Sequence, residues 1–481
     1  MKNTSKYFII LLVILIGGFA ARLYRFDNPI ADWHSWRQAD TSAVSRNFVQ
    51  DGFDLLHPRM DNISNVQSGL DNPQGYFFVE FPIYNAAQAG LYKLFGFLTL
   101  EEWGRLITIT SSMITCLFLY LLVSRHSNKA IGLWSAFFYS FIPFNIYYGR
   151  VILVDPSMVM AVTGGIYFFD RWLNSNSKSK VQGAKFYLLA LVFTTLAFLL
   201  KPVAVFFVLP MIVLAWQKFG WRLLLQWPLW LFAVVSVTPL IWWRTWMMQY
   251  PEGIPANTWL LNGNGIRFRP AFFRWIFYER LTKLISGYFG MVFVLVGIYK
   301  LAKQKDRLFF ASFLVSSLLY VCVFATGNVQ HDYYQIPIMP SIAIIFAIGS
   351  YYLSQWSFRK LPIGRVLLAL CLVGGFYFSW QQVQDYFNIN NRSIIVAGEA
   401  IDRLIPKDAK IIANYNGDSS FLYQTKRKGW ASFEKPIEEM VQMGASYLVL
   451  ANPTQTDMGL ARDYKVVSLT PEYVLFDLKK E

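Results

Sequence analysis

Long apolar runs recur along most of this sequence and constrain its fold more than any other feature. Runs of about 17 residues or more can cross the hydrocarbon core of a membrane as helices. Only helices and closed barrels satisfy their backbone groups in lipid, and the alternation typical of barrel strands is not seen. The sequence therefore predicts an all-α polytopic membrane protein, in keeping with 55% hydrophobic and only 15% charged residues.

We expect about eleven transmembrane helices. Their predicted ranges are 7–23, 105–123, 130–148, 151–169, 184–200, 202–217, 223–243, 284–301, 308–326, 334–354 and 363–383. Alternate short connections carry Arg125, Lys129, Arg171, Lys178, Lys218, Arg222, Lys303, Arg307, Arg359 and Arg365. Lys and Arg are favoured in cytoplasmic loops, which predicts a cytoplasmic N-terminus and a multi-pass protein of the plasma (inner) membrane. The same bias explains the net charge of +15 without nucleic acid as a partner.

The first outer loop, residues 24–104, contains two segments that suit helices lying in the membrane interface. In "DTSAVSRNFVQDG", Asp40 is expected at the N-cap and Gly52 as the stop. In "EFPIYNAAQAGLYKLFG", Pro82 is expected in the first turn and Gly96 at the end.

From about residue 384 onward, the amino-acid composition is typical of a soluble protein. "AKIIANY", "ASYLVLANP" and "YKVVSLTPEYVLFDL" predict strands, and "KPIEEMVQMG" predicts a helix between two of them. We therefore expect a transmembrane domain over residues 1–383 and a small extracytoplasmic α/β domain over 384–481.

Four acids are expected at the outer membrane surface: Asp32, Asp40, Glu80 and Asp155. Three of them have a structural explanation, namely a helix cap for Asp40, a dipole partner for Glu80 and a buried pair with Arg150 for Asp155. Several acids on one face are more than capping requires. A carboxylate in a partly dry site has a raised pKa and can act as a general base. The candidate catalytic residues are therefore Asp40, Asp155 and Glu80.

Several basic residues are expected on the outer side, although Lys and Arg are favoured in cytoplasmic loops. Lys201 follows a span in "FLLKPVAV", and Arg267 and Arg269 lie in "NGNGIRFRP". Guanidinium and ammonium groups bind phosphate well, although snorkelling to lipid headgroups is the alternative. With Arg150, these residues form the candidate phosphate site.

Two further motifs supply candidate contacts to a donor or acceptor. "ADWHSWRQAD" follows the first span, and "GNVQHDYYQIPIMPSIAI" lies at the outer mouth of a late one. A lone histidine or tyrosine at this level also occurs as a headgroup contact or in the aromatic belt. The candidate contact residues are Asp32, His34, Arg37, His331, Tyr333 and Tyr334.

Five motifs, taken in order, resemble the membrane-embedded GT-C glycosyltransferases. The likeness is strongest to the family 39 group, which includes protein O-mannosyltransferases and the aminoarabinose transferase that acts on lipid A. The motifs are "WRQADTSAVSRNF", "EFPIYN", "RVILVDPSMVM", "LKPVAVFFVLP" and "HDYYQIPIMPSIAI". The resemblance covers nearly the whole chain. It implies a GT-C fold and transfer of a hexose or pentose, with inversion, from a polyprenyl-phosphate donor to a lipid, glycan or protein acceptor at the outer face.

The chain departs from this family at two places. The first outer loop of the family carries an Asp-Glu pair, whereas Thr41 follows Asp40 here, so Asp40 is the best candidate base and Asp32 and Glu80 are held in reserve. Where the aminoarabinose transferase relatives show Lys-Pro-Pro, this chain has Glu80-Phe81-Pro82. Lys201 and the outer arginines are then expected to bind the phosphate.

Two other classes of function stay open at this stage. A transporter would place its sites near the membrane midplane and often shows inverted repeats, whereas the ionisable residues here lie at one face. A catalytically inactive glycan-binding relative is favoured only by the loss of the family's Glu at Thr41. No cofactor is certain, although several acids beside a lipid phosphate would suit Mg²⁺ or Mn²⁺.

Overall fold

The computed structural model describes residues 2–175 and 180–479, and the chain divides into two compact units. The first unit comprises residues 1–24, 106–242 and 257–385; the second comprises residues 25–105, 243–256 and 386–481. Most of the predicted first outer loop thus packs with the C-terminal residues as one unit. The predicted domain boundary at residue 384 stays a prediction, and the loop cation Lys178 lies outside the described residues.

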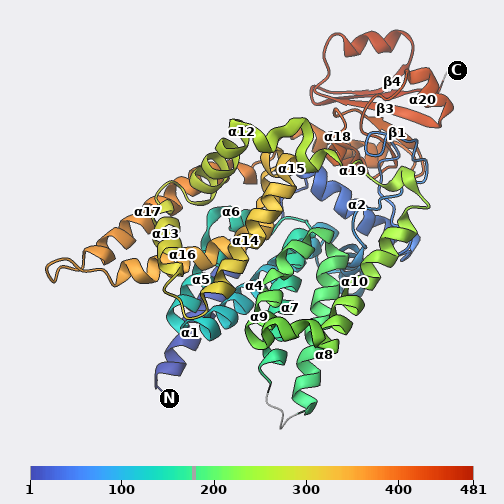
Figure 1. Ribbon diagram of the computed structural model, residues 1–481. Coiled ribbons are helices and arrows are strands. Elements are labelled where there is room, and N and C mark those ends of the chain that lie inside the picture. Colours follow the sequence, from blue (N-terminus) through green and yellow to red (C-terminus); the bar gives the residue numbers. More distant parts are fainter. Residues whose placement is uncertain (1, 176–179, 480–481) are drawn as a thin grey trace. The chain divides into compact units, whose positions relative to one another are not determined.

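The first unit is helical (Figure 1). Its longer helices are α1 (Lys2–Arg22), α5 (Lys129–Phe141), α7 (Asp155–Leu173), α8 (Lys180–Leu200), α9 (Leu209–Phe219), α13 (Met291–Leu301), α14 (Arg307–Val323), α16 (Met339–Ser354) and α17 (Ile363–Val383), with most of α4 (Leu100–His126) and α10 (Trp227–Met247). Its short helices are α6 (Pro143–Tyr148), α11 (Trp259–Asn262), α12 (Pro270–Phe273) and α15 (Ala325–Gln330). Helix α7 packs along α8, and α16 packs between α5 and α13.

Tighter or wider helical turns complete this unit. They are the 3₁₀ helices η1 (Pro202–Val208), η2 (Gly220–Leu225), η4 (Gly263–Phe268) and η6 (Asp332–Ile338) and the π-helix η5 (Arg274–Ile285). A further 3₁₀ helix, η7 (Gln384–Phe387), leads out of the unit.

Five helical segments among the described residues are long and apolar enough to cross a membrane, judged by length and composition. They are Leu100–His126, Val181–Leu200, Pro202–Leu225, Asp332–Ser354 and Ile363–Phe387. These segments indicate a membrane protein, and the expected number of eleven spans stays a prediction.

Several expected spans are interrupted. The segment predicted as one helix over 130–148 is divided into α5 and α6, because Pro143 has no N–H to continue the first helix and begins the second. The predicted start of a span at residue 284 is also wrong, since α13 begins only at Met291. Gly287 separates it from η5 with a positive φ of 51°, and a Cβ there would meet the carbonyl oxygen of Gly375 at 2.0 Å.

The second unit begins with two helices from the outer loop, α2 (Ser35–Asp51) and α3 (Ile83–Phe95), which pack together. The prediction of Asp40 as the N-cap of the first helix is wrong. His34 occupies that place with a left-handed φ of 52°, so α2 starts earlier and Asp40 lies inside it. Gly52 and Gly96 stand at the C-caps, as predicted.

The C-terminal residues of this unit contain a five-stranded sheet of order β2-β1-β3-β5-β4 (Figure 1). Strands β2, β1 and β3 are parallel, while β5 is antiparallel to both β3 and β4. The strands are β1 (Lys410–Ala413), β2 (Gly429–Trp430), β3 (Ala445–Ala451), β4 (Lys465–Leu469) and β5 (Tyr473–Asp477). Its other helices are η3 (Pro251–Gly253), α18 (Ser393–Leu404), α19 (Ser419–Thr425), α20 (Ile437–Gln442) and η8 (Asp457–Arg462).

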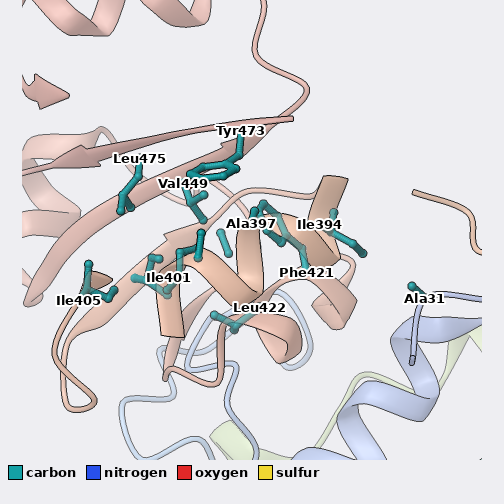
Figure 2. Close-up of a cluster of buried hydrophobic side chains, with 13 residues drawn as sticks. Ala31, Ile394, Ala397, Ile401, Ile405, Phe421, Leu422, Val449, Tyr473 and Leu475 are labelled. Carbon is teal, nitrogen blue, oxygen red and sulfur yellow. The ribbon is translucent and has the colours of Figure 1, made fainter. Parts of the chain in front are cut away.

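The outer loop contributes to both faces of this sheet. Asn62 pairs with Gly429 as an isolated bridge beside β2, and Ile63 packs in a cluster with Trp430. Ala31 joins the second cluster, which gathers α18, α19 and the strands around Phe421 (Figure 2). Apolar burial of this kind is the main favourable term in folding, so the loop and the C-terminal residues share one core.

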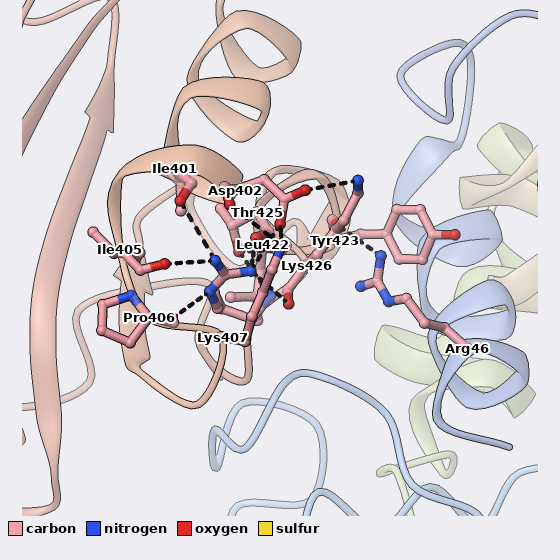
Figure 3. Close-up of polar contacts among 11 residues, drawn as sticks. Arg46, Ile401, Asp402, Ile405, Pro406, Lys407, Leu422, Tyr423, Thr425 and Lys426 are labelled. Atoms are coloured by element: carbon pink, nitrogen blue, oxygen red, sulfur yellow. Dashed lines mark hydrogen bonds and ion pairs between the residues drawn. The ribbon is translucent and has the colours of Figure 1, made fainter. Parts of the chain in front are cut away.

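Two arginines secure the short helices of this unit (Figure 3). Arg427 is 1% exposed and donates to the carbonyls of Ile405 and Pro406, which directly follow α18, and to Asp402. Arg46 of α2 lies 4.0 Å from the ring centroid of Tyr423 in α19. Helix ends leave carbonyls without intrahelical partners, and Arg427 donates to carbonyls at the C-terminal end of α18. The contact between Arg46 and Tyr423 connects α2 with α19.

Candidate active site

Asp40 lies on the buried face of α2 in the second unit. Its side chain accepts a hydrogen bond from the Ser419 hydroxyl, with Oγ 2.7 Å from Oδ1. The Gln67 amide nitrogen lies 3.4 Å from the other carboxylate oxygen. The residue is only 2% exposed, so a donor approaches each oxygen inside a nearly dry environment.

This environment changes the acidity of Asp40. Burial raises its pKa from 3.8 to about 6, while the Ser419 hydrogen bond and the charge of Arg37 act in the opposite direction. The charges of Asp418 and Asp61 raise it further. A carboxylate with a pKa near neutrality is ionised at physiological pH and is basic enough to take a proton from a reacting hydroxyl.

Arg37, three residues earlier on α2, holds Glu80. Its Nη2 atom lies 2.7 Å and 2.9 Å from the two oxygens of Glu80, and both side chains are buried. Asp32 is fully buried and accepts a hydrogen bond from the Gln38 amide at 2.7 Å. His34 is half-buried, with its ring centroid 5.0 Å from that of Trp33.

A second ionic cluster lies in the first unit. Helix α7 begins at Asp155, inside the span predicted over 151–169, and Lys201 follows α8 at the N-cap of η1. Lys201 Nζ lies 2.8 Å from each oxygen of Asp155, so the acid pairs with Lys201 rather than with Arg150, the partner considered from the sequence. The ring centroids of Tyr333 and Tyr334 lie 5.9 Å and 5.6 Å from the same ammonium, within the range of cation–π attraction.

The other predicted residues of the first unit have varied surroundings. Arg150 is fully buried, with its guanidinium 5.6 Å from the ring centroid of Tyr147. Arg267 donates to the backbone carbonyl of Val323 at 3.2 Å, and Arg269 is exposed. His331 stacks on Tyr333, with the ring centroids 5.5 Å apart.

The structure therefore divides the predicted residues between the two units. The set in the second unit is Asp32, His34, Arg37, Asp40 and Glu80. The set in the first unit is Arg150, Asp155, Lys201, Arg267, Arg269, His331, Tyr333 and Tyr334.

Sequence reasoning missed two partners of Asp40, Ser419 and Gln67. Ser419 stands 379 positions away along the chain, in the segment "NGDSS". That segment does carry a helix signal, because Asp418 caps α19 by accepting from the backbone N–H of Ser420 at 2.8 Å. Nothing in the sequence links it to the first outer loop.

Divalent ions such as Mg²⁺ and Mn²⁺ need several protein ligands close together. Across 2–175 and 180–479, no three His, Cys, Asp or Glu side chains are grouped so that they could hold a metal ion. The acids considered from the sequence as ligands of Mg²⁺ or Mn²⁺ therefore do not form such a group within these residues.

Comparisons with known proteins agree on one fold. Residues 79–243 match the family model described as dolichyl-phosphate-mannose-protein mannosyltransferase. No curated protein sequence matches the chain.

Solved structures match over nearly the whole chain. A crystal structure of ArnT from Cupriavidus metallidurans bound to undecaprenyl phosphate aligns with a TM-score of 0.67 at 13% identity, covering 99% of both chains. The Archaeoglobus fulgidus oligosaccharyltransferase in complex with Zn and sulfate aligns at 0.59 and 11% identity, covering 94% of this chain and 69% of that one. The same archaeal enzyme, AglB, with an inhibitory peptide and a dolichol-phosphate aligns at 0.55 and 11% identity, covering 92% and 69%. The resemblance seen in the sequence is confirmed, and the chain has the GT-C fold of membrane glycosyltransferases.

Proposed function

We propose that this chain is an inverting glycosyltransferase of the plasma (inner) membrane. It transfers a hexose or pentose from a polyprenyl-phosphate donor to a lipid, glycan or protein acceptor at the outer face, with its N-terminus in the cytoplasm and residues 384–481 outside. Two solved structures that share its fold support a lipid-phosphate ligand, since ArnT was crystallised with undecaprenyl phosphate and AglB was solved with a dolichol-phosphate.

In the proposed reaction, Asp40 acts as the general base. The acceptor hydroxyl gives its proton to the Asp40 carboxylate as its oxygen forms a bond to the sugar C1. The bond between C1 and the phosphate oxygen breaks, and polyprenyl phosphate leaves with the bonding electrons. Attack from the face opposite the leaving group inverts the anomeric carbon. Glu80, held by Arg37, and Asp32 are the acids in reserve.

We assign the stabilisation of the leaving phosphate to the first unit. Negative charge grows on the phosphate in the transition state, and preorganised cations stabilise it most effectively where water is scarce. Asp155 fixes the Lys201 ammonium in position, and the buried Arg150 adds a second positive charge in the same unit. Arg267 and Arg269 are further phosphate candidates, while His331, Tyr333 and Tyr334 are proposed to contact donor or acceptor, as are His34 and Arg37.

One observation carries this proposal: Asp40 is a carboxylate that is only 2% exposed, with the Ser419 hydroxyl 2.7 Å from one oxygen, and burial raises its pKa to about 6. To test it, purified protein in lipid nanodiscs is incubated with a radiolabelled polyprenyl-phosphate hexose and mixed cell-envelope acceptors, and the labelled covalent product is measured. Asp40→Asn should abolish product formation while the protein stays folded. Asp51→Asn makes the same change at an exposed position of α2 and should leave the rate unchanged.

The same experiment separates the competing functions. A transporter would carry the labelled compound into proteoliposomes without forming a covalent product. A glycan-binding protein would retain the label reversibly, with equal binding in wild type and in the Asp40→Asn variant. Full transfer activity in Asp40→Asn would remove Asp40 from the role of base.

A further inference from the structure

The C-terminal residues contribute directly to the surroundings of the candidate base. We infer that Ser419 of α19 is a positioning residue for Asp40, with a hydroxyl that serves the carboxyl group in both of its protonation states. This inference rests on the proposed function, in which Asp40 takes the proton of the acceptor. It gives the C-terminal residues a role in positioning the candidate base.

The Ser419 hydroxyl lies between two acceptors on α2. Its Oγ atom is 2.7 Å from Asp40 Oδ1 and 3.1 Å from the backbone carbonyl oxygen of Trp36. These two residues are one helical turn apart, so their oxygens face the same point on α19. A hydroxyl has one hydrogen to donate and two lone pairs that accept, which means that it cannot donate fully to both oxygens at once.

This geometry suits a carboxyl group that is protonated and deprotonated during the reaction. While Asp40 is ionised, Ser419 donates to Oδ1 and stabilises the negative charge. When Oδ1 carries the proton taken from the acceptor, Asp40 donates to Ser419 Oγ, and the serine hydrogen turns to the Trp36 carbonyl. The carboxyl group therefore keeps a hydrogen-bond partner before and after proton transfer, without any movement of the backbone. The proton then leaves to water.

Other contacts hold α19 in place for this purpose. The Tyr423 hydroxyl donates to Glu101, and the Tyr423 ring lies against the guanidinium of Arg46, which is paired with Asp61. Ser419 itself is buried. Because these bonds join α19 to the outer-loop residues, the position of the serine hydroxyl is set by the fold and not by a mobile surface loop.

Several charged groups surround Asp40 and act on its protonation together with Ser419. Arg37 on the same helix favours the ionised form, whereas Asp61 from the outer loop and Asp418 at the start of α19 disfavour it. Glu80, which precedes α3, is neutralised by its pair with Arg37. None of these groups is changed by a substitution at Ser419, so the effect of the hydroxyl can be measured separately.

The test compares four variants of the full-length protein in nanodiscs. Ser419→Ala removes the hydroxyl, Ser419→Thr keeps it, and Ser419→Cys replaces it with a weaker donor of similar size. Ser420→Ala is the matched control, because within the described residues the Ser420 hydroxyl is also buried and does not bond to Asp40. Two quantities are measured: the pH dependence of the transfer rate, and the pKa of Asp40 from the infrared band of its protonated carboxyl, assigned by its loss in Asp40→Asn.

Ser419→Ala should raise the pKa of Asp40 by about one unit, because the hydrogen bond favours the charged form. The transfer rate should then fall about fivefold at pH 6 and recover at pH 8, since only the ionised fraction changes. Ser419→Thr and Ser420→Ala should match the wild type, and Ser419→Cys should give an intermediate shift. A loss of folding alone would lower the rate equally at every pH.

The results that would overturn the role of Ser419 differ from those that would overturn the proposed function. If the wild type forms product, Asp40→Asn does not, and Ser419→Ala and Ser419→Cys show the wild-type pH profile and infrared pKa, the positioning role is overturned while the proposed function survives. If the wild type forms no covalent product, or if Asp40→Asn retains full activity, the proposed role of Asp40 fails first and the inference about Ser419 falls with it.

Discussion

Lys201 Nζ lies 2.8 Å from both carboxylate oxygens of Asp155, and both side chains are buried. The two residues stand 46 positions apart, at the start of α7 and just after the end of α8. A buried pair of this kind has two separable consequences. It affects stability, because neither charge is solvated, and in the proposed function it supplies a cation for the leaving phosphate.

The first prediction concerns stability. Lys201→Ala leaves the Asp155 carboxylate buried without its cation, and removing one partner of a buried pair costs about 3–5 kcal/mol. The double variant Lys201→Ala/Asp155→Ala should lose less than the sum of the two single changes, because no uncompensated charge remains. Thermal unfolding of the detergent-solubilised proteins measures this coupling. Additive losses would show that the two side chains do not interact energetically.

The second prediction concerns the donor. If Lys201 faces the leaving phosphate, its removal should raise the KM for the polyprenyl-phosphate sugar at least tenfold while changing the KM for the acceptor less than twofold, since one charge-assisted hydrogen bond contributes about 1.5–3 kcal/mol. Lys185→Ala, which changes an exposed lysine near the start of α8, at the opposite end of the helix from Lys201, is the control and should change neither constant. An unchanged donor KM in folded Lys201→Ala protein would argue against phosphate binding at this place.

The third prediction follows from the acidity of Asp40. Because burial raises its pKa to about 6, the ionised base should be lost as the pH falls through 6. Below that value the transfer rate should drop about tenfold per pH unit, since one protonation removes the base. Rates measured from pH 4.5 to 8 test this expectation. A rate that stays constant down to pH 5 would exclude Asp40 as the titrating group.

The elements of this fold differ in how well local sequence predicts them. Gly52 and Gly96 end their helices as expected, because a residue without Cβ readily adopts the backbone angles of a C-cap. The N-terminus of α2 was misplaced, since the pattern points to Asp40 as a cap whereas His34, in a left-handed conformation, begins the helix. Asp40 is better explained as a buried helical residue that finds its partner in a distant segment.

In the candidate site, too, the residues could be predicted from local sequence, whereas their tertiary partners could not. Acidic and basic residues at the expected outer surface could be named because charges near lipid are costly and therefore informative. Their partners could not be named: Asp155 pairs with Lys201 and Asp40 with Ser419, both through tertiary contacts. Strands β1, β3, β4 and β5 were predicted from their apolar pattern, but the two-residue β2 and the seven-residue α19 were not.

The fourth prediction is that Asp40 lowers stability at neutral pH. Its pKa is raised from 3.8 to about 6 in the folded protein, so the folded state binds the proton more tightly than the unfolded state does. Stability should therefore fall as the pH rises from about 4 to about 6, by about 3 kcal/mol in total, and stay lower above that range.

The variant Asp40→Asn isolates this effect, because its amide is neutral at every pH and its oxygen can still accept from Ser419. At pH 7 Asp40→Asn should unfold at a higher temperature than the wild type, and at pH 4 the two midpoints should coincide. Thermal melts at the two pH values provide the measurement. A variant that is less stable than the wild type at pH 7 would mean that Asp40 is ionised at no energetic cost, contrary to its burial.

The fifth prediction tests what holds the C-terminal residues together. Arg427 donates to the carbonyls of Ile405 and Pro406, which follow α18, and to Asp402, so Arg427→Met would leave the buried Ile405 carbonyl without this donor. We expect a loss of about 1–3 kcal/mol, since one unsatisfied buried group costs about that much. Lys426→Ala is the control: Lys426 also contacts Asp402, at 3.0 Å, but is largely exposed, and exposed ion pairs contribute about 1 kcal/mol or less. Hydrogen exchange of the amides of α18 and α19 measures the effect locally. Equal protection in Arg427→Met and Lys426→Ala would contradict the role of the buried guanidinium.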